Sequence, residues 1–333
     1  MNNNKTFIIA ELSANHNNDI DLALKTVRAA AATGADAIKV QTYTADSLAL
    51  DVDNEFFGPK REGLWKGIRP YDLYKEAALP YEWHRVIQKE AAEHGLIFFS
   101  SPFDHDAVDF LESLEVPLYK IASFEITDIP LIKYTASKRK PMIISTGVAN
   151  TDDISRALEA CRSVGNDDIT LLKCTSQYPA EISDANLATL SDLKERFQVK
   201  IGLSDHTMGF TVPMAAVALG ATVVEKHFIL DRSLGGADSS FSMEPNEFEQ
   251  MVSQVRLVEH AIGSVSYQIS DKDIYKRRSL FAVDDIKEGE LFSSFNIRSL
   301  RPGVGLHPMY YEHILDTPAK KSYKKGDPID VNG

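Results

Sequence analysis

Short runs of apolar and β-branched residues recur along the chain, and stretches of helical periodicity separate them. The runs are apolar throughout rather than on alternate positions, which is typical of parallel strands covered on both faces. We predict eight such strands, at residues 7–10, 37–41, 96–100, 118–122, 142–146, 169–174, 199–204 and 222–227.

Amphipathic stretches lie between these runs and follow the last of them. Their apolar residues recur with the period of an α-helix. The predicted helices are residues 19–33, 81–94, 105–115, 129–137, 152–164, 186–196, 210–219 and 245–262. Eight strands that each precede a helix predict an α/β fold, a (β/α)8 TIM barrel over residues 1–265.

One connection is much longer than the others. Residues 43–80 separate the second predicted strand from its helix, and they include Trp65 and several tyrosines and glycines. A connection of this length is usually functional or disordered. The aromatic content favours an ordered flap.

The pattern changes after the barrel. Residues 266–277 are polar and predict a linker, whereas residues 278–333 contain short strand-like runs with turns, such as YKKGDPIDV. This last segment of 56 residues has eight basic and eight acidic side chains, so the whole charge of −12 lies before it. A neutral β-rich module of this size is near the lower limit for independent folding, and we expect it to lean on a partner surface.

Composition narrows the classes of function. The chain is 44% hydrophobic and 25% charged, as globular proteins are. Its acidic balance argues against a nucleic-acid partner, and an anionic substrate would need a local cluster of cations. We expect neither a membrane span nor a secretory signal, since no apolar run is long enough. Cys161 and Cys174 match no zinc or redox spacing, which favours a cytoplasmic location.

Two lysines lie inside predicted strands, Lys39 in DAIKVQ and Lys120 in LYKIAS. An unpaired buried ammonium is costly, so each could be a snorkelling chain or an ion pair with Glu11 or Glu125. Active sites of TIM barrels lie at the C-terminal ends of the strands. Two lysines at matching strand ends therefore favour a clamp for phosphate or carboxylate.

His206 and His227 end the last two predicted strands. Neighbouring imidazoles can share one divalent metal ion, although a hydrogen-bonded pair of buried histidines is the alternative. Two protein ligands leave positions open for substrate or water, as a Lewis-acid catalyst requires. The nearby loop LGGADS could hold a phosphate, and its Asp238 could serve the site or be a solvated loop residue.

Motifs along nearly the whole chain resemble one family. They are IAELSANHNNDIDLAL, GADAIKVQTY, FFSSPFD, YKIASFEITDIPLI, PMIISTG, LKCTSQYP, IGLSDHTMG and VVEKHFILDR. They resemble those of the sialic-acid synthases, the phosphoenolpyruvate-condensing enzymes that make nonulosonic acids. The tail, RRSLFAVDDIKEGELFSSFNIRSLRPGVGLHPM, resembles their C-terminal antifreeze-like (SAF) domain, which gives residues 278–333 that identity.

Three features resemble the pseudaminic acid branch of this family more than the N-acetylneuraminate branch. They are Phe124, the loop LDRSLGGADSSFS and the insert GLWKGIRPYDLYKEAALPYEWH. The resemblance implies a transferase that condenses phosphoenolpyruvate with a 2,4-diacetamido-2,4,6-trideoxy-hexose of the L-altrose type and water. The products are pseudaminic acid and phosphate, formed with C–O cleavage. N-acetylneuraminate and legionaminic acid synthases are the alternatives within the family.

The resemblance also implies roles for individual residues. Glu11, Lys120, His206 and His227 would be catalytic, with Glu11 close to the metal ion and its water. His206 and His227 would hold Mn²⁺, with Mg²⁺ or Co²⁺ as alternatives. Phosphoenolpyruvate would be bound by Lys39, Gln41, Ser101, Lys120, Ser123, Ser145 and Ser204. The amino sugar would meet Glu125, Ser176, Tyr178, Asp238 and Arg301, the last supplied by the SAF domain of the other subunit of a homodimer.

Two other classes of protein are alternatives. Divalent-metal aldolases and deoxyheptulosonate-type synthases share the barrel and a lysine pattern, but the SAF-like tail and the NHN motif argue against them. A carbohydrate-binding or ice-binding protein without turnover is suggested by the tail alone. Such a protein would not need the polar strand ends of the first 277 residues.

Overall fold

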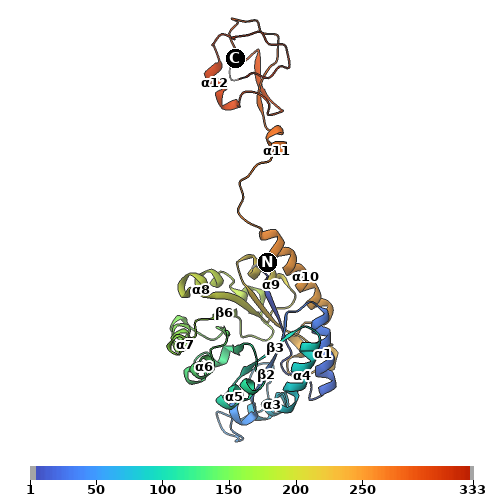
Figure 1. Ribbon diagram of the computed structural model, residues 1–333. Helices are drawn as coiled ribbons and strands as arrows, with labels where there is room; N and C mark the ends of the chain where they lie inside the picture. Colours follow the sequence, from blue (N-terminus) through green and yellow to red (C-terminus); the bar gives the residue numbers. More distant parts are fainter. Residues whose placement is uncertain (1–4, 331–333) are drawn as a thin grey trace. The chain divides into compact units, whose positions relative to one another are not determined.

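Eight parallel strands close into a barrel in the first part of the chain, in the order β1 to β8 (Figure 1). The computed structural model describes residues 5–330. Each strand begins and ends within two residues of its predicted bounds, so the predicted fold class is confirmed. The strands are β1 (Phe7–Glu11), β2 (Ala37–Thr42), β3 (Ile97–Pro102), β4 (Tyr119–Ile121), β5 (Met142–Ser145), β6 (Ile169–Cys174), β7 (Lys200–Asp205) and β8 (Val223–His227).

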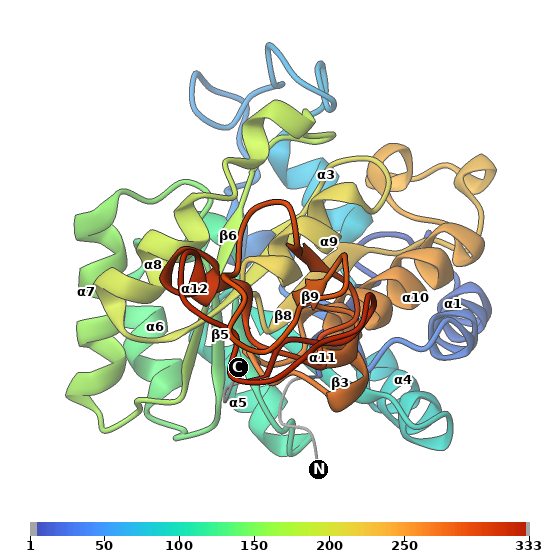
Figure 2. The same ribbon diagram turned by 90° about the horizontal axis from the view of Figure 1, so that it is seen from above.

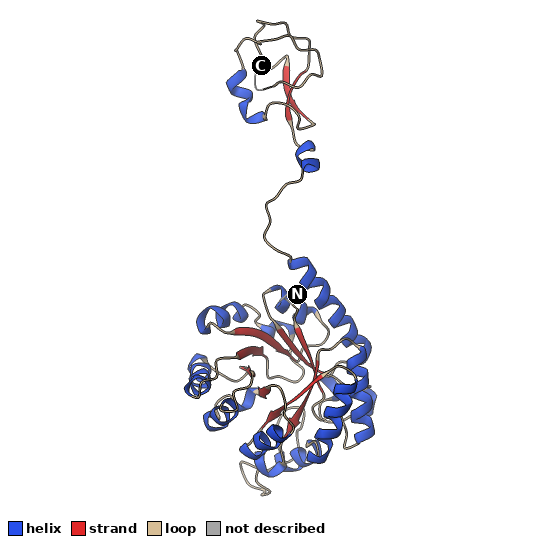
Figure 3. Cartoon of the chain, viewed as in Figure 1, coloured by secondary structure: helices blue, strands red, loops and turns tan. Residues whose placement is uncertain are grey.

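Helices surround these strands, as Figures 2 and 3 show. The longer helices pack apolar residues on the barrel: in α10, Phe248, Met251, Val252 and Val255 are buried at helical spacing. The helices are α1 (Ile20–Ala32), α2 (Ala45–Leu48), α3 (Pro70–Ala77), α4 (Tyr81–Glu93), α5 (His105–Ser113), α6 (Ile129–Ala136), α7 (Thr151–Ser163), α8 (Thr189–Phe197), α9 (Thr211–Ala218) and α10 (Pro245–Ile262).

The inside of the barrel has an apolar layer below a polar layer. Side chains two positions apart on a strand share a face. Each of the seven apolar residues in the lower layer is therefore followed, two positions later, by a residue of the upper layer. The lower residues are Ile9, Ala37, Phe99, Leu118, Ile143, Leu172 and Val223; the upper ones are Glu11, Lys39, Ser101, Lys120, Ser145, Cys174 and Glu225.

The seventh strand supplies Gly202 to the lower layer. A Cβ atom there would lie 2.5 Å from Leu172 Cδ2 and 2.6 Å from the Val223 carbonyl oxygen. Real Cβ atoms do not come so close, so only glycine fits between the neighbouring strands. Ser204 follows two positions later and takes its place in the polar layer.

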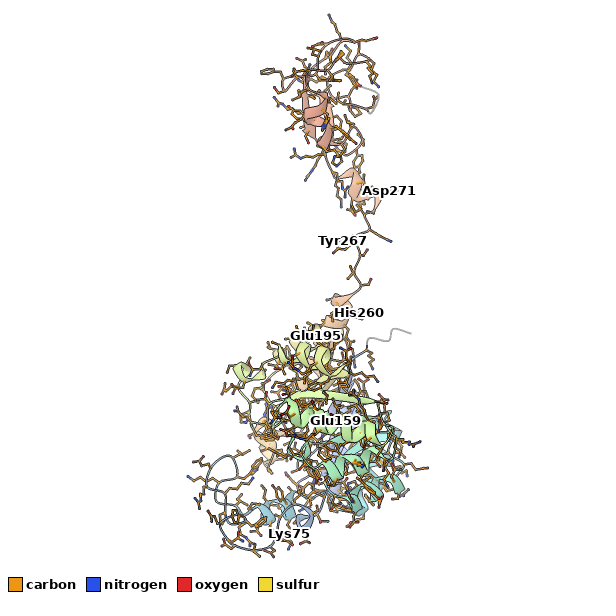
Figure 4. All side chains as sticks on the ribbon, turned by 90° about the vertical axis from the view of Figure 1, so that its left-hand side faces the viewer. Lys75, Glu159, Glu195, His260, Tyr267 and Asp271 are labelled. Carbon is orange, nitrogen blue, oxygen red and sulfur yellow. The ribbon has the colours of Figure 1, made fainter. Side chains whose placement is uncertain are left out.

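The long connection between β2 and α4 is folded onto the barrel loops, as its aromatic content predicts. It contains α2 and α3, and Lys75 marks α3 in Figure 4. Trp65 Nε1 donates a hydrogen bond to the Ala237 carbonyl oxygen at 3.2 Å. His16 Nε2 lies 3.3 Å from the Ala77 carbonyl oxygen. The segment therefore contacts the loops that follow β1 and β8.

The chain divides by contacts into two compact units, Met1–Gly263 and Ser264–Gly333. The segment predicted as a linker contains exposed Tyr267, labelled in Figure 4, and a short helix, α11 (Asp271–Tyr275).

The second unit has its own core and less strand than its pattern predicts. β9 (Ser279–Ala282) pairs antiparallel with β10 (Ile297–Leu300), and isolated bridges and α12 (Tyr311–Ile314) complete it. Leu280, Phe292, Ile297 and Ile329 are fully buried. Within residues 5–330, no helix is long and apolar enough to cross a membrane.

Candidate active site

Two buried lysines meet one carboxylate in the polar layer of the barrel. Lys39 Nζ lies 3.4 Å from Glu225 Oε1, and Lys120 Nζ lies 3.6 Å from the same oxygen. Lys39 also forms an ion pair with Glu11, its register partner on β1. None of these four side chains is more than 6% exposed. The ion-pair alternative for Lys39 is thus correct in part, and Glu225 joins both lysines.

Hydroxyl groups complete this layer. Lys120 Nζ donates to Ser145 Oγ at 2.7 Å, and Lys39 Nζ donates to Ser101 Oγ at 3.4 Å. Ser204 Oγ donates to Glu225 Oε1 at 3.4 Å. Five of the seven residues predicted to hold phosphoenolpyruvate, Lys39, Ser101, Lys120, Ser145 and Ser204, therefore lie together at one depth. The other two, Gln41 and Ser123, line the cavity above. Ammonium and hydroxyl groups are donors that suit phosphate and carboxylate oxygens.

Burial and charge act against each other on the ionisable groups here. Burial raises the pKa of Glu11 to about 7, although Lys39 acts to lower it. For Lys39, burial is outweighed by Glu11 and Glu225, and its pKa is raised. Burial lowers the pKa of Lys120, and the opposing attraction of Glu225 is too weak to cancel this effect. Glu11 can therefore exchange a proton near neutral pH, as a general acid or base must.

The two histidines lie side by side above this layer, with ring centroids 5.2 Å apart. His206 Nδ1 lies 2.9 Å from the Thr175 carbonyl oxygen and donates to it. Burial acts to lower the pKa of His206, but its contacts with Cys174 and with this carbonyl oxygen raise it. His227 Nδ1 is buried and has no hydrogen-bond partner within residues 5–330. No group of three His, Cys, Asp or Glu side chains in that range could hold a metal ion by itself.

A cavity of about 280 Å³ opens above the lysines. Several of its residues come two positions after the polar layer: Ser13 after Glu11, Gln41 after Lys39, and His227 after Glu225. The cavity therefore lies nearer the strand ends than the lysines do. Its other walls include Ser123, Glu125, Tyr178 and Asp238. This is a pocket with polar groups at its base and aromatic side chains around it, as small-molecule sites are.

Two acids in this cavity are affected by burial. Burial raises the pKa of Glu125 to about 7, and its Oε2 has no hydrogen-bond partner in the described part of the chain. Burial also raises the pKa of Asp238, whose Oδ2 lies 3.9 Å from His227 Nδ1 and accepts from the Ala14 amide at 3.4 Å. Asp238 is 8% exposed, so the solvated alternative is wrong.

Ser176 lies beside the cavity and reaches one of its residues. Its Oγ lies 2.6 Å from Ser123 Oγ and 3.7 Å from Cys174 Sγ. A Cβ atom on Gly147 would lie 2.1 Å from Ser176 Oγ, so glycine is required there for the hydroxyls to meet. Burial alone would raise the pKa of Cys174, but contact with His206 lowers it to about 7.

Arg301 is the one predicted site residue outside the barrel. It follows β10 in the second unit, where its side chain is exposed. The other predicted residues lie in the polar layer, in the cavity or beside them.

Sequence reasoning missed two members of this site. Glu225 was assigned no role from the sequence, although it contacts both lysines. Trp65 was noted only as part of an aromatic segment, yet it lines the cavity. The sequence signal for Glu225 is its position two residues after Val223, which places both side chains on the same face of the strand. No periodic signal marks Trp65, which lies in a turn.

Comparisons with known proteins agree with the fold. Residues 26–267 match the NeuB family, and residues 277–330 match the SAF domain. Pseudaminic acid synthase of Campylobacter jejuni is 47% identical over 98% of this chain and 95% of its own length. N,N'-diacetyllegionaminic acid synthase of the same species is 37% identical, over 98% of this chain and 99% of its own.

A solved structure is similar as well. The N-acetylneuraminic acid synthetase of Leptospira borgpetersenii, in complex with citrate, is 32% identical and superimposes with a TM-score of 0.72. The match covers 81% of this chain and 89% of that chain.

Proposed function

The chain belongs to the NeuB family, and from that premise we propose that it is an enzyme that makes pseudaminic acid. It condenses phosphoenolpyruvate with a 2,4-diacetamido-2,4,6-trideoxy-hexose of the L-altrose type and water, and it releases phosphate. The observation that carries this assignment is 47% identity to a pseudaminic acid synthase, against 37% to a legionaminic acid synthase, each over 98% of this chain.

Phosphoenolpyruvate binds in the polar layer. Lys39 and Lys120, with Ser101, Ser145 and Ser204, supply donors for its phosphate and carboxylate. Local cations are needed because the chain carries a net charge of −12. Gln41 and Ser123, which line the cavity above, can reach the same substrate from its open side.

The amino sugar binds in the cavity. Glu125, Tyr178 and Asp238 line it, and Ser176 reaches it through Ser123. C3 of phosphoenolpyruvate attacks the aldehyde carbon of the open-chain sugar, and C2 becomes electron-poor. Glu11, with a pKa of about 7, is suited to orient the water that adds to C2 and to accept its proton. Phosphate then leaves by cleavage of the C–O bond.

A divalent cation, Mn²⁺ or a similar ion, fits the histidine pair. Among the described residues, His227 Nδ1 is buried without a hydrogen-bond partner, and the Thr175 carbonyl oxygen holds His206 Nδ1, so Nε2 of His206 would be its metal ligand. Two nitrogen ligands leave positions for substrate and water. Bound there, the ion would act as a Lewis acid that stabilises the charge developing on the aldehyde oxygen.

We further propose a homodimer in which the SAF domain of one subunit brings Arg301 to the active site of the other, because the barrel site contains no arginine of its own among the residues that line its cavity. A cytoplasmic location is consistent with two buried cysteines that form no disulfide in the described chain.

Mass spectrometry tests the substrate. Purified protein is incubated with phosphoenolpyruvate, Mn²⁺ and, in separate reactions, N-acetylmannosamine, 2,4-diacetamido-2,4,6-trideoxymannose and its 6-deoxy-altrose isomer. We expect a nine-carbon acid from the altrose isomer only. A product from another sugar assigns the enzyme to a different branch, and binding of phosphoenolpyruvate without turnover would favour a carbohydrate-binding protein.

A chelator experiment tests the metal. We expect removal of divalent ions to abolish turnover and added Mn²⁺ to restore it. His206→Ala and His227→Ala should bind Mn²⁺ more weakly by calorimetry while keeping the circular dichroism of the native chain. Full activity of these variants in chelator-treated buffer would contradict the metal proposal.

A further inference from the structure

A second cavity, of about 610 Å³, adjoins the one that holds the proposed sugar site. Its walls come from the loop after β1, from the long segment 43–80 and from the loop after β8. Much of the lining is apolar, with Leu64, Ile68, Leu73 and Leu234 among its residues. None of the predicted site residues lines it.

Five residues line both cavities and therefore form the partition between them. They are Ala14, Trp65, Leu73, Ala77 and Ala237. Three are alanines, and Leu73 is 93% buried on α3, so Trp65 is the large side chain whose removal would join the two spaces.

The indole of Trp65 is fixed in this position by contacts on three sides. Its Nε1 donates to the Ala237 carbonyl oxygen at 3.2 Å, next to Asp238. Its ring centroid lies 6.1 Å from that of Tyr178, and Lys60 Nζ lies 4.9 Å from the ring. A side chain held in this way acts as a fixed wall.

We propose that Trp65 limits the length of the N-acyl group that the enzyme accepts on its amino sugar. This inference rests on the proposed function. The acyl chain is the part of the sugar that can lengthen without altering the carbons that react. Beyond the indole lies a space whose lining includes Leu64, Ile68 and Leu234, which suits added methylene groups. The polar residues that line it as well are Asn17, Asn18, Glu76, Ser239 and Ser240.

The test compares kcat/KM for wild type, Trp65→Ala and Trp65→Phe on three sugars. One is the diacetamido sugar, and in the other two either the 2- or the 4-acetyl group is replaced by butanoyl. In wild type we expect the butanoyl group at one position to reduce kcat/KM by about tenfold or more. In Trp65→Ala, kcat/KM for this butanoyl sugar should be close to that for the diacetamido sugar. The reduction in Trp65→Phe should lie between those in wild type and Trp65→Ala. The KM for phosphoenolpyruvate should stay unchanged in both variants.

Trp83 provides the matched control, because the chain has only two tryptophans. Trp83 lies on α4, where it packs against the core and against His16, with ring centroids 6.0 Å apart. Trp83→Phe should keep the wild-type selectivity. If Trp65→Ala keeps the wild-type ratio at both positions, the proposal is wrong. If that variant does not fold, Trp65→Leu takes its place in the same comparison.

Failure of the proposed function gives a different result. If wild type condenses N-acetylmannosamine but not the trideoxy sugar, the substrate assignment is wrong, and N-acyl mannosamines then test Trp65 in the same way. Fluorescence gives an independent reading. Trp83→Phe, in which only Trp65 remains, should change its emission when titrated with the amino sugar alone, whereas Trp65→Phe should not. The reverse pattern would overturn the proposal.

Discussion

Lys120 is an ammonium with 2% of its surface exposed, and its contacts are a hydroxyl, a carbonyl and one shared carboxylate. Ser145 and the Ile121 carbonyl oxygen take up two of its three N–H donors, and Glu225 Oε1, at 3.6 Å, is beyond hydrogen-bond distance, so one donor is left for an anionic ligand. We predict that Lys120→Met weakens phosphoenolpyruvate binding by about 1.5–3 kcal/mol, because a charge-assisted hydrogen bond is lost. Calorimetric titration measures this, and sugar affinity should change less.

Lys173 is the control for that substitution. It lies on β6, and its Nζ donates to the Cys174 carbonyl oxygen at 3.1 Å and to Thr175 Oγ1 at 3.3 Å. It belongs to neither the polar layer nor the cavity lining. Lys173→Met should leave phosphoenolpyruvate affinity unchanged. Equal affinities in wild type and Lys120→Met would make Lys120 a structural ion-pair partner.

Glu125 makes stability depend on pH. Burial raises its pKa from 4.5 to about 7, so the folded chain holds a proton that the unfolded chain releases. The stabilisation is complete below pH 4.5 and is lost as the pH rises through 7. We predict that the free energy of unfolding of wild type, relative to Glu125→Gln, falls by up to about 3 kcal/mol across this window. Urea unfolding at pH 5 and pH 8 measures the difference, and parallel curves for the two proteins would contradict it.

Among the elements, β7 and β8 are joined by a buried ion pair. Asp205 and Lys226 are register partners, and their side chains are in contact at 3% and 0% exposure. Asp205 also accepts from the Thr207 amide at 3.0 Å, and Lys226 donates to the Thr207 carbonyl oxygen. The pair thus fixes the two strand ends that carry His206 and His227.

Breaking this pair should cost more than replacing it. Lys226→Met leaves a buried carboxylate without its cation, and we predict a loss of about 3–5 kcal/mol in the free energy of unfolding. The double variant Asp205→Leu with Lys226→Met should lose less than the single one. Urea unfolding measures the three free energies. If Lys226→Met is as stable as wild type, water compensates the charge of the Asp205 carboxylate.

The barrel strands were predictable because buried parallel strands leave continuous apolar runs. The polar layer was partly predictable: Lys39 and Lys120 stand out as charges inside such runs, whereas Glu225 belongs to the mixed sequence EKH, where spacing alone says which side chain points inward. The segment 43–80 has no period. The contact between Trp65 and Ala237 joins residues 172 positions apart, and local sequence carries no record of it.

At the scale of the whole molecule, the proposed dimer makes a prediction about complementation. Arg301→Ala and His206→Ala homodimers should each be nearly inactive. A mixed dimer contains one barrel with both histidines that receives an intact Arg301 from the other chain, so subunit exchange should restore part of the activity. Absence of recovery, with mixed dimers shown by mass spectrometry, would mean that Arg301 acts within its own chain or has no role.

A closed apolar layer lies beneath the lysines. A ligand can therefore reach the polar layer only from the strand ends, through the cavity. A molecule held on Lys39 and Lys120 lies beneath one that fills the cavity, so depth dictates the order of arrival. In the proposed arrangement, phosphoenolpyruvate therefore has to enter before the sugar, and phosphate has to leave after the nine-carbon acid. A sugar that binds first would block the path by which phosphoenolpyruvate reaches the lysines. We therefore expect substrate inhibition by the sugar: the initial rate should fall, rather than level off, when the sugar is in large excess over phosphoenolpyruvate.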